Sequence, residues 1–137
     1  MKIKDNIDGV VRLDFSELDY VNPQQPSQFL KAILSINVDD FKVKTMISAE
    51  ISDFEEILTG FKILHKTLTQ TFYFQHNDQR VVIKFAPDKT GHICVSGTVK
   101  SVDYKTSLVF EFYTDQTFLP EIIEKLEKEI DKVKIGI

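Results

Sequence analysis

The feature that most constrains this chain is a two-residue alternation of apolar and polar side chains on both sides of Asp39-Asp40. Apolar residues occupy every second position from Leu30 to Val38, and the alternation resumes from Phe41 to Ile47. Successive side chains of a β-strand point to opposite faces, so the pattern predicts two half-buried strands. A two-residue hairpin at Asp39-Asp40 places every apolar residue of this alternation on one face. The pairs that this hairpin predicts are Val38 with Phe41, Ile36 with Val43, and Ala32 with Ile47.

The second half of the chain repeats this alternation. A turn at Asn77-Asp78 would set Phe74 opposite Val81 and Phe72 opposite Ile83. Further strands are expected over 93–99 and 108–112, and Gly91 falls where a turn requires positive φ. Near the N-terminus, the sequence predicts a first strand over Val10–Phe15, followed by a long connection over Ser16–Gln28.

Two segments have the period of a helix instead. The first begins at a capping-box pattern, Ser52-Asp53-Phe54-Glu55, and contains Gly60, which costs about 1 kcal/mol relative to Ala in a helix. The second runs from about Leu119 to Val133, with a proline in its first turn, where no backbone donor is lost. The stripe predicted to face inward on the first helix is Phe54, Ile57, Leu58, Phe61, Leu64 and Leu68. The outward pairs predicted on the second helix are Glu121 with Lys125 and Glu124 with Lys128.

These elements predict an α+β fold, in which an antiparallel meander of about seven strands carries two helices packed on one face. The chain has 137 residues, which is the usual size of one domain. We therefore expect a single domain over residues 1–137, as a monomer or a weak homodimer formed through its edge strands.

Charge and cysteine content exclude several function classes. The 17 basic and 21 acidic residues give a net charge of −4, which argues against direct binding to nucleic acid. Cys94 is the only cysteine, so no intramolecular disulfide is possible and a reducing compartment is expected. No apolar run approaches the roughly 18 residues needed to cross a bilayer. We expect a cytoplasmic protein without a membrane partner.

The sequence contains no glycine-rich phosphate loop, nucleophile elbow or paired metal-binding motif, so we expect no enzymatic activity, cofactor or metal ion. The nearest approach to a catalytic pair is His92 and Cys94, which lie on the same face of a predicted strand. Such a histidine could raise the thiolate fraction of a cysteine. The alternative, a partly covered cysteine beside a turn, is favoured because one spacing match is common. A zinc site there would need two more ligands, of which only His76 and scattered carboxylates are available.

Two candidate surfaces for binding a partner remain. The first is an acidic stretch between Asp5 and Asp19, from which we select Asp14, Glu17 and Asp19 as residues that could steer a basic protein. The second is the sheet face away from the helices, which holds Tyr73, Tyr113 and His92 beside Cys94 and Glu111. The plainer alternatives are a solvated acidic surface and an ordinary polar sheet face. Aromatic side chains dominate the energetics of many interfaces, which favours Tyr73 and Tyr113 as contacts.

Four short segments of the chain resemble the WapI family of immunity proteins, over roughly residues 41–133. These segments are Ala49–Phe54, Gly91–Val95, Leu108–Phe112 and Thr114–Leu119. The resemblance implies a non-enzymatic protein that binds and occludes a cognate bacterial toxin domain, which in such systems is often a nuclease. Asp115 or Thr117 is expected to cap the last helix.

A second function remains open from the residues themselves. Apolar side chains between the sheet and the helices could line a pocket for a small molecule or a lipid. The residues expected to line it are Phe54, Phe61, Phe72 and Phe110. A large cavity there would favour this binding module over the inhibitor.

Overall fold

The computed structural model describes residues 1–25, 27–75 and 79–135. The described residues form eight strands, one 3₁₀ turn and two α-helices. The strands are β1 (Lys2–Lys4), β2 (Val11–Tyr20), β3 (Phe29–Val38), β4 (Phe41–Glu50), β5 (Phe72–Gln75), β6 (Val81–Pro87), β7 (His92–Lys100) and β8 (Ser107–Asp115). The helices are α1 (Ile51–Thr67), η1 (Gln116–Phe118) and α2 (Leu119–Ile135).

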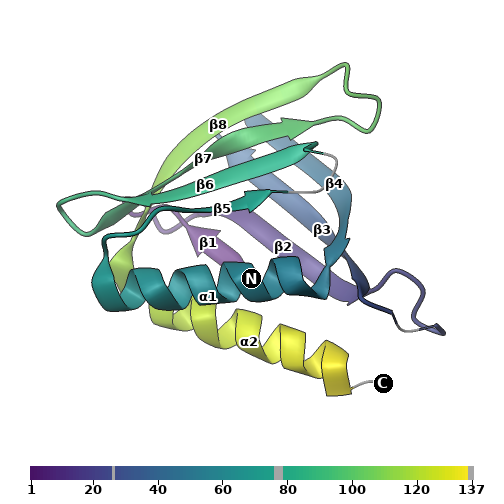
Figure 1. Ribbon diagram of the computed structural model, residues 1–137. Helices are drawn as coiled ribbons and strands as arrows, with labels where there is room; N and C mark the ends of the chain where they lie inside the picture. The colour runs from purple at the N-terminus through teal and green to yellow at the C-terminus, as the bar shows by residue number, and fades with distance from the viewer. Residues whose placement is uncertain (26, 76–78, 136–137) are drawn as a thin grey trace.

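The strands form two four-stranded antiparallel sheets, sheet A in the order β1-β2-β3-β4 and sheet B in the order β5-β6-β7-β8. The sheets face each other, and α1 and α2 run side by side along one open side (Figure 1). The α+β class is therefore confirmed, but the single seven-stranded meander is wrong. After β4 the chain passes through α1 before it forms β5, so the second meander covers the first and both inner faces are buried.

The core is common to both sheets and both helices. Phe15, Phe54 and Phe74 contact one another edge to face or tilted, with ring centroids 5.3–6.3 Å apart. Phe72 stacks on Phe85 at 4.7 Å and also meets Phe61 of α1. Such aromatic pairs add to the free energy gained from burying their area. This cluster joins α1 to both sheets.

The hairpin at Asp39-Asp40 has the predicted register, with Val38 opposite Phe41, Ile36 opposite Val43 and Ala32 opposite Ile47. The predicted register of the next hairpin is wrong by two residues. Phe74 lies opposite Ile83 and Phe72 opposite Phe85, while Asn77 and Asp78 lie outside the described residues. A register shift of two residues keeps every side chain on its predicted face, because the side-chain period of a strand is two. Phe74, Val81, Ile83 and Phe85 are therefore still buried.

Arg80, the residue before β6, makes side-chain hydrogen bonds to both sheets. Its guanidinium donates to the carbonyl of Met46 at 2.6 Å, to Thr45 Oγ1 at 3.0 Å and to the carbonyl of Lys100 at 3.0 Å. These bonds tie the start of β6 to β4 and to the end of β7. Arg80 is only 6% exposed, so the contact is a buried polar link between the two sheets.

The N-terminal prediction is wrong in two respects. First, β1 was not predicted. Second, β2 continues to Tyr20, so the first five residues of the expected connection over Ser16–Gln28 belong to a strand. The continuation is possible because a β-bulge lies between Ser16 and Asp19, with Glu17 at a φ of 55°. The bulge breaks the apolar alternation from which the strand was predicted.

The helices follow their predicted stripes with small changes at the ends. Phe54, Ile57, Phe61 and Leu64 are buried on α1. The predicted cap is wrong, because α1 begins at Ile51 and Asp53 accepts from the backbone N–H of Glu50 at 2.9 Å. The salt bridges predicted on α2 are confirmed, at 3.1 Å for Glu121 with Lys125 and 2.9 Å for Glu124 with Lys128.

Two glycines have clear structural reasons. A Cβ on Gly60 would lie 2.5 Å from the ring of Phe72, so the glycine lets α1 approach sheet B closely. Gly91 has a φ of 86°, which confirms the positive φ expected of this turn. In the described parts of the chain, no helix is long and apolar enough to cross a membrane.

Candidate functional site

The outer face of sheet B carries three of the predicted contact residues, Tyr73, His92 and Tyr113. Tyr73 of β5 shares a row with Lys84, Ser96 and Glu111, and Tyr113 of β8 lies opposite Cys94. Tyr73 is 56% and Tyr113 41% exposed, so another molecule can reach both rings. The two tyrosines lie on opposite edge strands and two residues out of line, about 16 Å apart from the spacing of neighbouring strands and the rise per residue. This face presents aromatic groups at its edges and polar groups at its centre.

The predicted His92–Cys94 pair lacks the features of a nucleophilic site. The His92 ring contacts Thr90 Oγ1 at 3.1 Å and lies 3.8 Å from Asp88 and 3.9 Å from Asp115. Partial burial, and next the charge of Glu111, raise the pKa of the Cys94 thiol. A raised pKa lowers the thiolate fraction, which is opposite to what a nucleophile needs.

The carboxylates of Asp88 and Asp115 lie on either side of His92. A hydrogen bond from the Thr90 hydroxyl lowers the pKa of Asp88, which also accepts from the backbone of Thr90 and His92. The hydroxyl of Thr117 likewise lowers the pKa of Asp115, which caps the 3₁₀ turn before α2 and not, as expected, the last helix itself. His92 is therefore part of a hydrogen-bonded turn that orders the end of sheet B.

A metal site is not formed by the residues that the structure describes. Among them, no group of three or more histidine, cysteine, aspartate or glutamate side chains could hold an ion. His76, the second candidate ligand in the sequence, lies outside the described residues.

The acidic residues near the N-terminus do not form one uniform patch. Arg12 binds Asp8 at 2.9 Å and Asp5 at 3.5 Å, and these two charges are therefore compensated. Asp14 lies 3.9 Å from the amino nitrogen of Met1 and has a side chain only 23% exposed. Glu17 and Asp19, at the bulge of β2, are exposed. Of the predicted acidic contacts, these two are the ones available to a partner.

The structure keeps the two predicted sets apart. Asp14, Glu17 and Asp19 belong to sheet A, whereas Tyr73, His92 and Tyr113 belong to sheet B. Glu17 and Asp19 border Lys31, Ile33 and Met46, whose side chains alternate with the buried ones of sheet A. A partner that covers one set therefore does not automatically cover the other.

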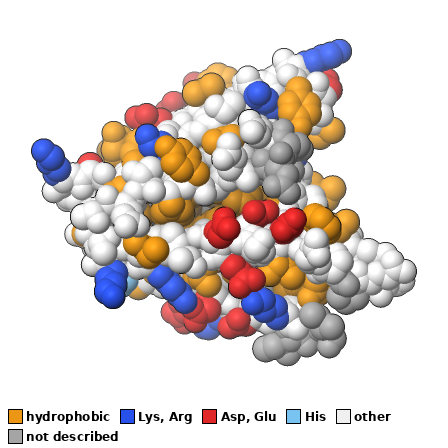
Figure 2. All heavy atoms as spheres, in the orientation of Figure 1, with side chains coloured by type: hydrophobic (Ala, Val, Ile, Leu, Met, Phe, Trp, Pro, Cys, Tyr) orange, Lys and Arg blue, Asp and Glu red, His pale blue; other side chains and the backbone are white. Residues whose placement is uncertain are grey.

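Acidic side chains also gather over the N-terminal half of α1 (Figure 2). This half of the helix contains Asp53, Glu55 and Glu56. Glu55 binds Lys134 of α2 at 3.3 Å, and Asp53 is used in the cap. Carboxylates near a helix N-terminus are stabilised by the helix dipole, so this cluster has a structural explanation.

The expected pocket between sheet and helices is replaced by packed core. Phe54, Phe61 and Phe110 are at most 4% exposed, and Phe72 is packed against them as part of the same core. Four pockets formed by the described residues are lined by other side chains. The prediction of a ligand pocket at this place is therefore wrong.

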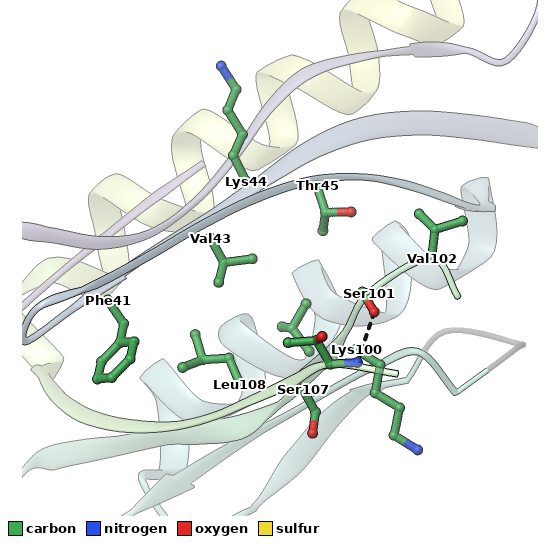
Figure 3. A pocket seen from close by; sticks show the side chains of 11 residues that line it. Phe41, Val43, Lys44, Thr45, Lys100, Ser101, Val102, Ser107 and Leu108 are labelled. Atoms are coloured by element: carbon green, nitrogen blue, oxygen red, sulfur yellow. Dashed lines mark hydrogen bonds between the residues drawn. The ribbon is translucent and has the colours of Figure 1, made fainter. Parts of the chain in front are cut away.

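An apolar groove lies instead at the far end of the sandwich, between β4 and the ends of β7 and β8. Its volume is about 430 Å³. Figure 3 shows Phe41 and Val43 of β4 on one wall and Leu108 of β8 on the other, with Thr45 further along β4. Sequence reasoning missed this groove. Phe41 and Val43 have the parity of core residues, and only the position of sheet B shows that Phe41 is left exposed and Val43 is covered only in part.

The comparisons with known proteins agree with the resemblance described above. A family model, described as the Immunity protein WapI-like family, matches residues 2–134. The match thus extends well beyond residues 41–133, on which the resemblance was based, and includes β1 and β2. No curated protein and no solved structure gives a significant match.

Proposed function

The chain belongs to the WapI-like immunity protein family, and from this premise we propose that it binds a cognate toxin domain and blocks its active site. The observation that carries this proposal is the family match over nearly the whole chain. We further propose that it acts in the cytoplasm, by occlusion and without chemistry of its own. The raised pKa of Cys94 and the position of His92 are consistent with a role that needs no nucleophile.

Charge supports a basic toxin as the partner. The chain has a net charge of −4, and Glu17 and Asp19 are exposed acids for which the described residues provide no ion pair. A nuclease domain has a basic cleft because it must bind phosphates. An acidic inhibitor is attracted by the positive potential of this cleft at long range, and it competes with the nucleic acid for the cleft.

The outer face of sheet B supports binding to a protein. Tyr73 and Tyr113 are exposed aromatic groups on rigid strands, and such side chains lose little conformational entropy on binding. We propose that they, with His92, contribute contacts to a partner.

The test is to express the toxin domain encoded beside this gene, with and without this protein, and to measure growth. We expect the protein to restore growth and to co-purify with an inactive variant of the toxin domain. A chain in which Phe110 is replaced by Ala serves as a destabilised control, because its lower stability should reduce the amount of folded protein that can protect the cell. If growth is not restored and no complex forms, the proposed function is wrong.

A further inference from the structure

Next to the apolar groove, the edge of sheet A carries backbone groups of Lys42 and Lys44 that have no partner among the described residues. β4 is the outermost strand and pairs only with β3 among the described strands. The carbonyl of Met46 points away from β3, because it accepts from Arg80 at 2.6 Å. Backbone groups of an antiparallel strand alternate in direction, so the N–H and C=O of Lys42 and Lys44 also point away from β3. These groups form a template for one more strand.

The groove offers apolar pockets directly beside that template. Phe41 is 62% exposed although it has the parity of a core residue, and Val102 across the groove is 77% exposed. Val43 and Leu108 are covered only in part. A strand added to β4 would direct every second side chain into this groove, because neighbours opposite each other lie on the same face.

The charge of the edge indicates which strand fits. Lys42 and Lys44 are exposed on the outer face of β4, and no carboxylate lines the groove. A second copy of this chain that paired through β4 would set lysines against lysines, which is unfavourable. The strand that fits has carboxylates opposite Lys42 and Lys44, on the outer face of β4. It has apolar side chains opposite Phe41 and Val43, on the face that lines the groove.

We propose that this edge, defined as Phe41–Thr45 with Val102 and Leu108, binds an extended segment of the toxin in which apolar and acidic residues alternate. The segment adds to sheet A as a fifth strand, with its apolar side chains in the groove. This inference rests on the proposed function, since it names the part of the toxin that docks. It adds an anchor that is separate from the outer face of sheet B and from Glu17 and Asp19.

The first test removes one backbone donor from the edge. Lys44→Pro deletes an N–H that β3 does not use, so the β3–β4 ladder is kept. Lys44→Ala is the matched control, because it removes the charge and keeps the N–H. For the inactive toxin domain encoded beside this gene, we expect Lys44→Pro to weaken binding at least tenfold and Lys44→Ala to weaken it only a few-fold.

A second set of variants tests the groove and the charges without altering the backbone. Phe41→Ser and the double variant Lys42→Glu/Lys44→Glu change exposed side chains, so folding should be unaffected. We expect each to weaken binding about tenfold or more. The control is Ile63→Ser, which alters an exposed apolar residue of α1, outside the surfaces proposed to bind, and should bind like the unaltered chain.

Hydrogen exchange gives an independent readout. The amides of Lys42 and Lys44 should exchange quickly in the free protein and at least tenfold more slowly in the complex. If the unaltered chain binds the toxin domain, but Lys44→Pro and Phe41→Ser bind equally well and these amides stay unprotected, the docking site is wrong and the proposed function stands. If the unaltered chain does not bind at all, both are wrong.

Discussion

At the scale of single residues, Arg80 is the polar group on which the junction of the sheets depends most. It is nearly fully buried and donates to groups of β4 and β7. Arg80→Met would leave the carbonyls of Met46 and Lys100 without these donors, and each buried unsatisfied group costs about 1–3 kcal/mol. We expect the free energy of unfolding to fall by about 2–4 kcal/mol in urea denaturation.

A matched control for this prediction is Arg12→Met. The ion pairs of Arg12 with Asp5 and Asp8 are partly exposed, and exposed pairs contribute less than about 1 kcal/mol. Equal losses for the two variants would contradict the role of Arg80 as a link between the sheets.

Cys94 provides a second prediction at this scale, on reactivity. Burial raises its pKa first, and Glu111 raises it further, whereas Lys84 lowers it. At pH 8 we therefore expect slow alkylation by iodoacetamide, a few-fold faster reaction in Glu111→Gln and slower reaction in Lys84→Gln. His92→Ala should leave the rate unchanged. A clear loss of rate in His92→Ala would instead indicate that the histidine activates the thiol.

At the scale of elements, the alternation along β8 separates core from surface between adjacent residues. Phe110 is 4% exposed, whereas its neighbour Val109 is 76% exposed. We expect Phe110→Ala to lower the free energy of unfolding by about 3–5 kcal/mol. Val109→Ala should cost less than about 1 kcal/mol. Thermal unfolding of both variants tests the assignment of Phe110 to the core and Val109 to the surface. Similar melting temperatures for the two variants would contradict it.

Also at this scale, the predicted elements succeed where they depend on neighbours in the chain. The hairpin at Asp39-Asp40, the stripe of α1 and the outward pairs of α2 were predicted correctly, because side-chain period and short turns determine them. The elements that were predicted wrongly depend on contacts between segments far apart in the chain. The three residues of β1 form a strand because they pair with β2. β2 extends past Glu17 because a β-bulge between Ser16 and Asp19 accommodates that residue.

At the scale of the whole molecule, the distribution of charge leads to a kinetic prediction. Glu17→Lys/Asp19→Lys reverses the exposed acids of β2 and leaves Asp14, which lies beside the Met1 amino group, unaltered. We expect association with a basic toxin domain to slow several-fold at low ionic strength, with thermal unfolding unchanged. The difference should vanish at high salt, where such fields are screened. An unchanged association rate at low salt would exclude this patch as a steering surface.

The candidate surfaces were predictable only in part from the sequence. That Tyr73, His92 and Tyr113 share one face follows from strand parity, and the structure agrees. The separation of this face from the acidic residues of β2 did not follow, because parity gives the side of a strand and not the sheet to which the strand belongs. The groove beside Phe41 was missed for the same reason.

The sequence by itself determined which side chains alternate, where the helices lie and how the first hairpin pairs. These properties follow from contacts between residues close in the chain, whose geometry is set by the period of strand or helix. The tertiary structure alone decided that the strands divide into two facing sheets, that Arg80 joins them, and that β4 pairs with β3 alone among the described strands. Each of these depends on which distant segments meet, and a local pattern of apolar residues is the same whether or not another layer covers it.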